Sequence, residues 1–227
     1  MTTNVKVTDI EEAALREYAA ILSSYAGRIR LTGPSDPELI FRDHIEDSLA
    51  VMHLLPASGR VIDVGSGGGL PGMAWAICRP GLQVVLLDSI AKKCAALLEI
   101  SVRLGLRNVQ VLCARCEEHA AESRESYSAA AARAVSSLDV VLEYLAPLVA
   151  PGGRLITFKG PNYAEEMRPM LGLWETLGLS DPEVDRYMVY GKERYVLSWE
   201  KIAPTPERYP RRVGAAEKSR WWRGVNR

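Results

Sequence analysis

The chain has 227 residues and a formal net charge of zero, with 48% hydrophobic and 25% charged residues, a composition typical of a globular protein that buries a substantial core. No apolar run approaches the ~20 residues of a membrane span, and the polar stretch 1–12 lacks the pattern of a signal peptide, so we expect a cytoplasmic protein. Its four cysteines do not indicate a disulfide scaffold in a chain of this size: Cys78, Cys94, Cys113 and Cys116.

The first part of the chain, 1–56, is predicted to be a helical extension. Thr8 and Glu11 match a capping box, and apolar residues then recur at three-to-four spacing, which predicts a helix over 8–30. A Gly-Pro loop follows. Pro37 is a favourable first-turn residue for a second helix, which we expect to reach about residue 54.

From residue 60 onward the pattern alternates between short apolar strands and helices. The expected strands are 60–64, 82–87, 109–113, 129–132 and 154–158. The expected helices are 71–79, 90–104 and 138–150, followed by an interrupted helical stretch at 163–177 and a closing hairpin from 187–190 and 195–200. This succession predicts an α/β fold over 57–202, Rossmann-like, with a mostly parallel sheet and helices on both faces.

A glycine-rich loop at 65–69 follows the first strand and precedes a helix, and glycines allow a tight turn and the close approach of a ligand. Gly72 and two loop glycines give the G-x-G-x-x-G of a dinucleotide site, whereas Asp63 stands two residues before a G-x-G-x-G run, as in S-adenosylmethionine sites. The second pattern begins where the strand ends, so it favours the methyl donor over a dinucleotide or a turn without ligand. The candidates for donor binding are Asp63, Gly65, Gly67 and Gly69.

Two later strand ends supply further candidates. Asp88 ends the second strand and suits the ribose hydroxyls of either ligand, and Glu117 follows the third strand, where it is either an acceptor near adenine or a solvated acid. Cys113-x-x-Cys116 has no second pair of ligands nearby, and the three histidines show no metal spacing. The sequence therefore predicts no metal site.

Several motifs follow one another in a specific order. They are Leu31-Thr32, His44-Ile45-Glu46-Asp47-Ser48, the strand and loop 62–72, Asp88 with Lys92-Lys93, Arg115 with Glu117, Ala132-Arg133-Ala134, Lys159-Gly160, and Gly191 with Arg194-Tyr195. In this order, over roughly 31–200, they resemble the bacterial ribosomal RNA small subunit methyltransferase G family, also called glucose-inhibited division protein B.

The resemblance implies a class I methyltransferase that methylates N7 of a guanine in 16S ribosomal RNA, guanine 527 by the family's target. It implies donor contacts by Gly65, Leu70, Asp88, Cys116, Glu117 and Arg133. The chain departs from the family pattern at Arg30, Asp43, Lys93 and Cys116. A small-molecule methyltransferase on the same fold and a non-catalytic, nucleotide-sensing binding module stay open as alternatives.

Methylation of guanine N7 requires no general base, because this atom already carries a free lone pair. The sequence shows no evident base constellation, which agrees with catalysis by positioning and exclusion of water. Arg133 ends the fourth strand and is the candidate catalytic residue, with a structural ion pair as the alternative.

The end of the chain is basic. Residues 201–227 contain eight basic and two acidic residues, a charge of +6 that is balanced by −6 in the rest of the chain. A basic tail, 203–227, on an acidic body suits a polyanion, and Trp221-Trp222 beside cations suits RNA. The alternatives are a disordered basic end and aromatic residues that pack back on the body. We expect a monomer that acts on 16S ribosomal RNA or the small ribosomal subunit. The candidate RNA contacts are Lys92, Lys93, Lys159, Arg211, Arg212 and Arg220.

Overall fold

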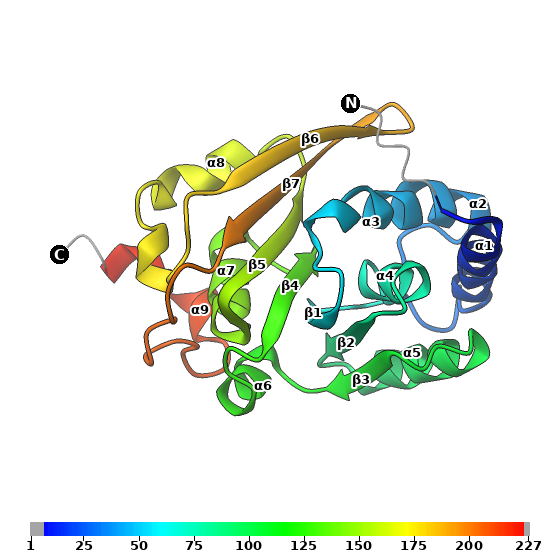
Figure 1. Cartoon of the computed structure of the whole chain (residues 1–227), viewed down its shortest axis with the longest axis horizontal. Helices are drawn as coiled ribbons and strands as arrows, with labels where there is room; N and C mark the ends of the chain where they lie inside the picture. The colour runs from blue at the N-terminus through cyan, green and yellow to red at the C-terminus, as the bar shows by residue number, and fades with distance from the viewer. Residues whose placement is uncertain (1–6, 225–227) are drawn as a thin grey trace.

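The computed structural model describes residues 7–224, which are built around a seven-stranded sheet with the strand order β3-β2-β1-β4-β5-β7-β6 (Figure 1). Neighbouring strands are parallel except at β7, which runs antiparallel to both β5 and β6. The strands are β1 (Gly59–Val64), β2 (Leu82–Asp88), β3 (Val109–Cys113), β4 (Tyr127–Arg133), β5 (Val149–Lys159), β6 (Glu183–Val189) and β7 (Lys192–Glu200). The predicted α/β fold with a mostly parallel sheet is confirmed.

Helices cover both faces of this sheet (Figure 1). One face carries α1 (Asp9–Ser24), α2 (Pro37–Ile40), α3 (Glu46–Ala50), α4 (Gly72–Cys78) and α5 (Ala91–Arg103). The other carries α6 (Cys116–Glu122), α7 (Leu138–Leu145), α8 (Tyr163–Met167) and α9 (Ala215–Lys218). Within residues 7–224, no helix combines the length and the apolar character that a membrane crossing requires.

The two hydrophobic cores follow from the alternation of side chains along each strand. In β1, Val61 packs into the core beneath α4 and α5, whereas the adjacent Ile62 packs into the core beneath α7. The four alanines 129–132 of β4 alternate between the same two cores. Because both faces of the central strands are covered, polar side chains such as Asp88 and Arg133 are concentrated where these strands end.

Three predicted helix boundaries were wrong. α1 ends at Ser24 rather than at residue 30, since the chain turns away at Gly27, whose φ angle is +80°. The second predicted helix is divided by a π-helical turn, Phe41–Ile45, which separates α2 from α3. The helix predicted to reach residue 150 ends at Leu145, and β5 begins at Val149 and pairs with β4.

Both flanking segments pack onto the sheet and its helices. Tyr18 in the extension is fully buried in the core beneath α4 and α5. Tyr209, Ala216 and Trp221 in the tail are buried in the core beneath α7. Through residue 224, the tail is therefore part of the packed body rather than a free basic end.

Candidate functional site

Three pockets that share residues lie along the carboxyl edge of the sheet. The central pocket is lined by the glycine loop. The acidic pocket contains Asp88 and Glu117, beyond β2 and β3, and the arginine pocket contains Lys159, beyond β5. Gly65 lines both the central and the acidic pocket, and Arg133 lines both the central and the arginine pocket. The three pockets therefore form one row from β3 to β5.

The glycine loop turns sharply because three of its residues have left-handed backbone angles, with φ of +69° at Gly65, +57° at Gly67 and +93° at Gly69. A Cβ atom at position 65 would lie 2.5 Å from Cγ2 of Val135. The hydroxyl of Tyr18 in α1 donates a hydrogen bond of 2.6 Å to a carbonyl oxygen of the loop. Backbone without side chains, held in place by Tyr18, thus lines the central pocket.

Asp63 lies near the end of β1 with only 1% of its surface exposed. Its Oδ2 atom accepts a hydrogen bond of 3.0 Å from the backbone N–H of Gly72. Its Oδ1 atom is buried and has no partner among the residues that the structure describes. Burial raises the pKa of Asp63 to about 7, opposed by the Gly72 hydrogen bond and the charge of Arg133. Asp63 lines none of the three pockets, so this buried acceptor atom lies behind the pocket walls rather than on them.

Asp88 supports the glycine loop and also faces the acidic pocket. Its Oδ2 atom accepts a hydrogen bond of 3.0 Å from the N–H of Gly67, and its Oδ1 atom accepts one of 2.9 Å from the N–H of Ile90. The Nζ atom of Lys93 lies 3.9 Å from Oδ2. Each carboxylate oxygen has two lone pairs, so these bonds leave capacity for a ligand hydroxyl.

Helix α6, which was not predicted from the sequence, brings Cys116 and Glu117 to the acidic pocket. The Cys116 thiol donates to the carbonyl oxygen of Tyr144 at 3.5 Å, and burial raises its pKa, so it is a protonated packing group. The Oε1 atom of Glu117 accepts a hydrogen bond of 2.9 Å from the N–H of Gly214. Within residues 7–224, no group of three or more potential ligands is placed to hold a metal ion.

Arg133 ends β4, and residues of the N-terminal extension hold its guanidinium. Its Nη1 atom donates to the carbonyl oxygen of His44 at 3.1 Å, to Oδ2 of Asp47 at 3.3 Å and to Oγ of Ser48 at 3.4 Å. Only 15% of the Arg133 side chain and 7% of the Asp47 side chain are exposed. Arg133 therefore forms a buried ion pair with Asp47 and also lines the central and the arginine pocket.

Four residues around Arg133 were not predicted as site residues: His44, Asp47, Tyr187 and Arg194. His44 lines both the central and the arginine pocket, and burial together with the charge of Arg133 lowers its pKa to about 4. The Oδ1 atom of Asp47 accepts a hydrogen bond of 2.8 Å from the hydroxyl of Tyr187, and Nε of Arg194 lies 3.9 Å from the same oxygen. The spacing His44-x-x-Asp47 within one helical segment was the sequence signal that could have identified these two residues. The row of pockets thus has a neutral imidazole beside a fixed cation.

The six candidate RNA-contacting cations lie in different settings. Three pair with acids of the body: Lys159 with Glu166, Arg211 with Glu143, and Arg220 with Asp139. Lys93 lies near Asp88, and Lys92 and Arg212 are exposed. The structure does not gather these cations on one element, since Lys92 and Lys93 belong to α5 and the arginines belong to the tail.

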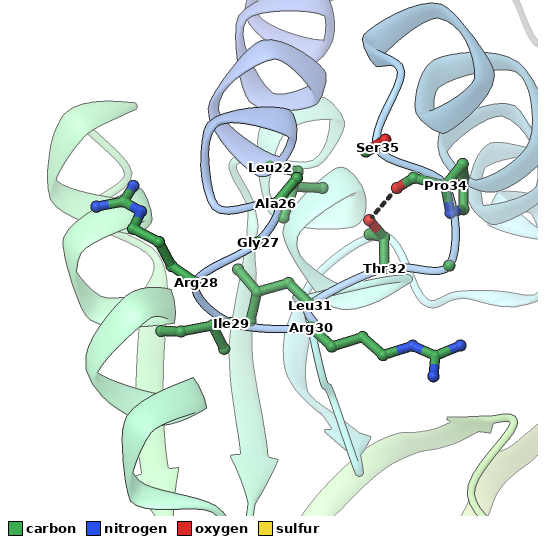
Figure 2. A pocket seen from close by; sticks show the side chains of 11 residues that line it. Leu22, Ala26, Gly27, Arg28, Ile29, Arg30, Leu31, Thr32, Pro34 and Ser35 are labelled. Atoms are coloured by element: carbon green, nitrogen blue, oxygen red, sulfur yellow. Dashed lines mark hydrogen bonds between the residues drawn. The ribbon is translucent and has the colours of Figure 1, made fainter.

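A further hollow, the loop pocket, lies where the chain passes from α1 to α2 (Figure 2). Residues 22–35 alone line it, and the Thr32 hydroxyl donates a hydrogen bond of 2.8 Å to the carbonyl oxygen of Pro34. Figure 2 shows the side chains of Arg28 and Arg30 pointing away from each other. Arg30 also lines the central pocket, so this loop adds a cation to that pocket.

Comparison with known sequences gives one consistent result. The family profile GidB, described as rRNA small subunit methyltransferase G, matches residues 11–187. A protein of Pseudothermotoga lettingae is 36% identical over 208 residues, which cover 91% of this chain and 90% of that protein. A protein of Rubrobacter xylanophilus is 40% identical over 223 residues, which cover 94% and 85%. Both are named ribosomal RNA small subunit methyltransferase G.

Comparison with solved structures finds the same sheet in other methyltransferases. A precorrin-6y C5,15-methyltransferase from Geobacter metallireducens has a TM-score of 0.54 at 12% identity and covers 69% of this chain and 87% of that chain. A tRNA methyltransferase from Aquifex aeolicus has a TM-score of 0.54 at 14% identity, with coverage of 70% and 69%. At these identities the likeness shows the fold alone.

Proposed function

Because the chain belongs to the rRNA small subunit methyltransferase G family, we propose that this methyltransferase transfers a methyl group from S-adenosylmethionine to N7 of a guanine in the 16S RNA of the small ribosomal subunit, in the cytoplasm. The observation that carries the proposal is the row of pockets, joined by Gly65 and Arg133. A donor over the glycine loop and a base beside Arg133 would meet in the central pocket, which is the proximity that transfer requires.

The residues of the central and acidic pockets fit S-adenosylmethionine. The bare glycine backbone of the central pocket leaves room for the ligand. Asp63 lies outside the pocket linings, and its unpartnered Oδ1 atom would become the acceptor for the donor's amino group when the ligand binds. Asp88 and Glu117 offer acceptors to hydroxyl and amino groups, and the buried Leu70 supplies an apolar wall. When bound, this donor supplies a methyl group on a positively charged sulfur.

The position of Gly72 does not discriminate between this donor and a dinucleotide, because the third glycine of a dinucleotide site also serves close helix–strand packing. In the dinucleotide pattern, Gly72 would be the third glycine of the ligand loop. In the fold its N–H is bonded to Asp63, and a Cβ atom there would lie 2.4 Å from Cδ2 of Leu86. Helix–sheet packing therefore accounts for this glycine without a ligand.

The residues around Arg133 position an acceptor base rather than activate it. Guanine N7 needs no deprotonation, His44 is neutral at physiological pH, and Asp47 is engaged by Arg133 and Tyr187. Among the described residues, the protein acceptors of Arg133 bind only its Nη1 atom. Its other N–H groups remain for guanine O6, which would orient the base and leave the N7 lone pair free.

The proposal is tested with purified protein, labelled donor and small subunits from cells that lack the gene. We expect one N7-methylguanine in the 16S RNA, located by mass spectrometry. Arg133→Lys keeps a cation beside Asp47 but loses the planar fork of donors, so transfer should fall at least about tenfold while donor binding remains. Methylation of small molecules alone, or donor binding without any transfer, would reject the proposed substrate.

A further inference from the structure

The tail is anchored to α7 by buried ion pairs. Arg211 binds Glu143 through Nε, which lies 2.8 Å from Oε1, and through Nη2, and only 2% of the Glu143 side chain is exposed. One turn earlier, Asp139 accepts hydrogen bonds from Nη1 of Arg220 at 3.3 Å and from Nε1 of Trp222 at 3.1 Å. These contacts fix the segment between Arg211 and Trp222 on the body.

The anchored segment reaches the acidic pocket at two points. The N–H of Gly214 binds Oε1 of Glu117 at 2.9 Å, and Gly214 has a φ angle of +74°, which turns the chain toward the pocket. Glu217, three residues later, lines the pocket together with Asp88 and Tyr144. The tail therefore contributes a side chain to a pocket that the sheet edge alone leaves incomplete.

The chemistry of this pocket is that of an acceptor. Glu117 is 8% exposed, and its Oε2 atom has no protein partner among the described residues. Glu217 adds a second carboxylate, and Arg115 is the one cation on the described lining. Carboxylates accept hydrogen bonds from amino and hydroxyl groups and do not donate to carbonyl groups. The pocket therefore suits adenine, which carries an exocyclic amino group, better than a purine that carries a carbonyl group at that position.

We infer that Glu217 is a specificity-determining residue of the donor site, which accepts a hydrogen bond from the amino group of adenine, and that the tail serves to bring it there. The inference rests on the proposed function, because it takes S-adenosylmethionine as the ligand. It also assigns Arg211 and Arg220 to anchoring the tail rather than to contacting RNA.

The test compares two probes by calorimetry: S-adenosylmethionine and its inosine counterpart, in which a carbonyl oxygen replaces the amino group. Wild type should prefer the adenosine form. Glu217→Ala should weaken this form by roughly fivefold, since it removes one hydrogen bond. Glu217→Gln supplies a donor for the carbonyl group, so it should shift the ratio of the two affinities by roughly tenfold toward the inosine form.

Glu207→Gln is the matched control, because Glu207 is an exposed tail acid that does not line the pocket. It should leave both affinities unchanged, and thermal unfolding should show that all variants fold. Wild-type preference for adenosine that persists unaltered in both Glu217 variants would overturn the inference alone. A wild-type protein that binds neither probe would overturn the proposed donor itself.

Discussion

Asp63 is held where its charged form is unfavourable and one of its oxygens lacks a partner. The folded protein retains the Asp63 proton up to about pH 7, whereas the unfolded chain loses it near the ordinary value of 3.8. The unfolded state therefore binds fewer protons between these values, and the contribution of Asp63 to the free energy of unfolding decreases as the pH rises from about 4 to about 7.

Without ligand, burial favours the protonated form of Asp63. A donor with a positively charged amino group should favour the ionised form instead, because it stabilises the carboxylate. We expect its affinity to rise between pH 6 and pH 7.5, by up to about tenfold per pH unit. Calorimetric titration of wild type and Asp63→Asn would measure this, and the amide retains an acceptor for Gly72. The donor's own amino group titrates with both proteins, so identical pH profiles would show that Asp63 does not contact it. The transfer rate with saturating donor should stay flat from about pH 6 to about pH 9.

At this scale, strand ends were a good guide to the site. Asp63, Asp88 and Arg133 follow apolar strands, so their place at the carboxyl edge could be inferred before any contact was known. The partners of Arg133 could not be inferred, since Asp47 lies 86 residues away in the chain and Tyr187 lies a further 54 residues beyond Arg133. Glu217 had no signal either, because it sits in a basic segment whose own cations are paired with α7.

Among the elements, the glycine loop allows a controlled test of backbone geometry. Gly65 and Gly105 have nearly equal φ angles, +69° and +65°, but a Cβ atom at 65 would meet Val135 at 2.5 Å, whereas position 105 is open. Both alanine substitutions should destabilise the fold by about 1 kcal/mol through left-handed strain. Gly65→Ala should in addition weaken donor binding by at least about tenfold, because the added Cβ atom would push the loop away from Val135. Equal donor affinities in the two variants, measured by calorimetry, would contradict the assigned role of the loop.

Strands and long helices were predicted better than the short elements between them. Short apolar runs identified the five parallel strands, whereas α6 has seven residues and carries too little periodicity to be recognised. The π-helical turn Phe41–Ile45 has no sequence signature and was read as continuous helix. These missed elements supply His44, Cys116 and Glu117 to the pockets.

For the whole molecule, the uneven charge along the chain is partly neutralised by folding. Lys201 pairs with Glu125, Arg211 with Glu143 and Arg220 with Asp139. Within the described residues, Arg212 and Lys218 make no ion pair and are exposed. A count of tail cations therefore overstates the charge that is available to a polyanion.

Salt dependence of RNA binding should separate these two sets of cations. If the free cations contact phosphates, Arg212→Ala with Lys218→Ala should reduce the slope of log affinity against log salt by about 1.4–1.8. Arg211→Ala should leave the slope nearly unchanged. It should lower the free energy of unfolding by about 3 kcal/mol, because the buried Glu143 carboxylate would lose its charge partner. Filter binding across salt concentrations and denaturant unfolding would measure both. An unaltered slope in this double variant would remove Arg212 and Lys218 from the RNA interface.

The arginine pocket has a kinetic consequence for folding. The glycine loop joins β1 to the helix that follows it directly, and its contacts with Tyr18 and Asp88 span 50 and 21 residues. Asp47, by contrast, contacts Arg133 and Tyr187, which lie 86 and 140 residues away, so these contacts close longer loops at a higher cost in chain entropy. The donor loop and the base-binding half therefore differ in the loop-closure entropy that each must overcome, and the second depends on contacts that reach from the N-terminal extension to the last hairpin.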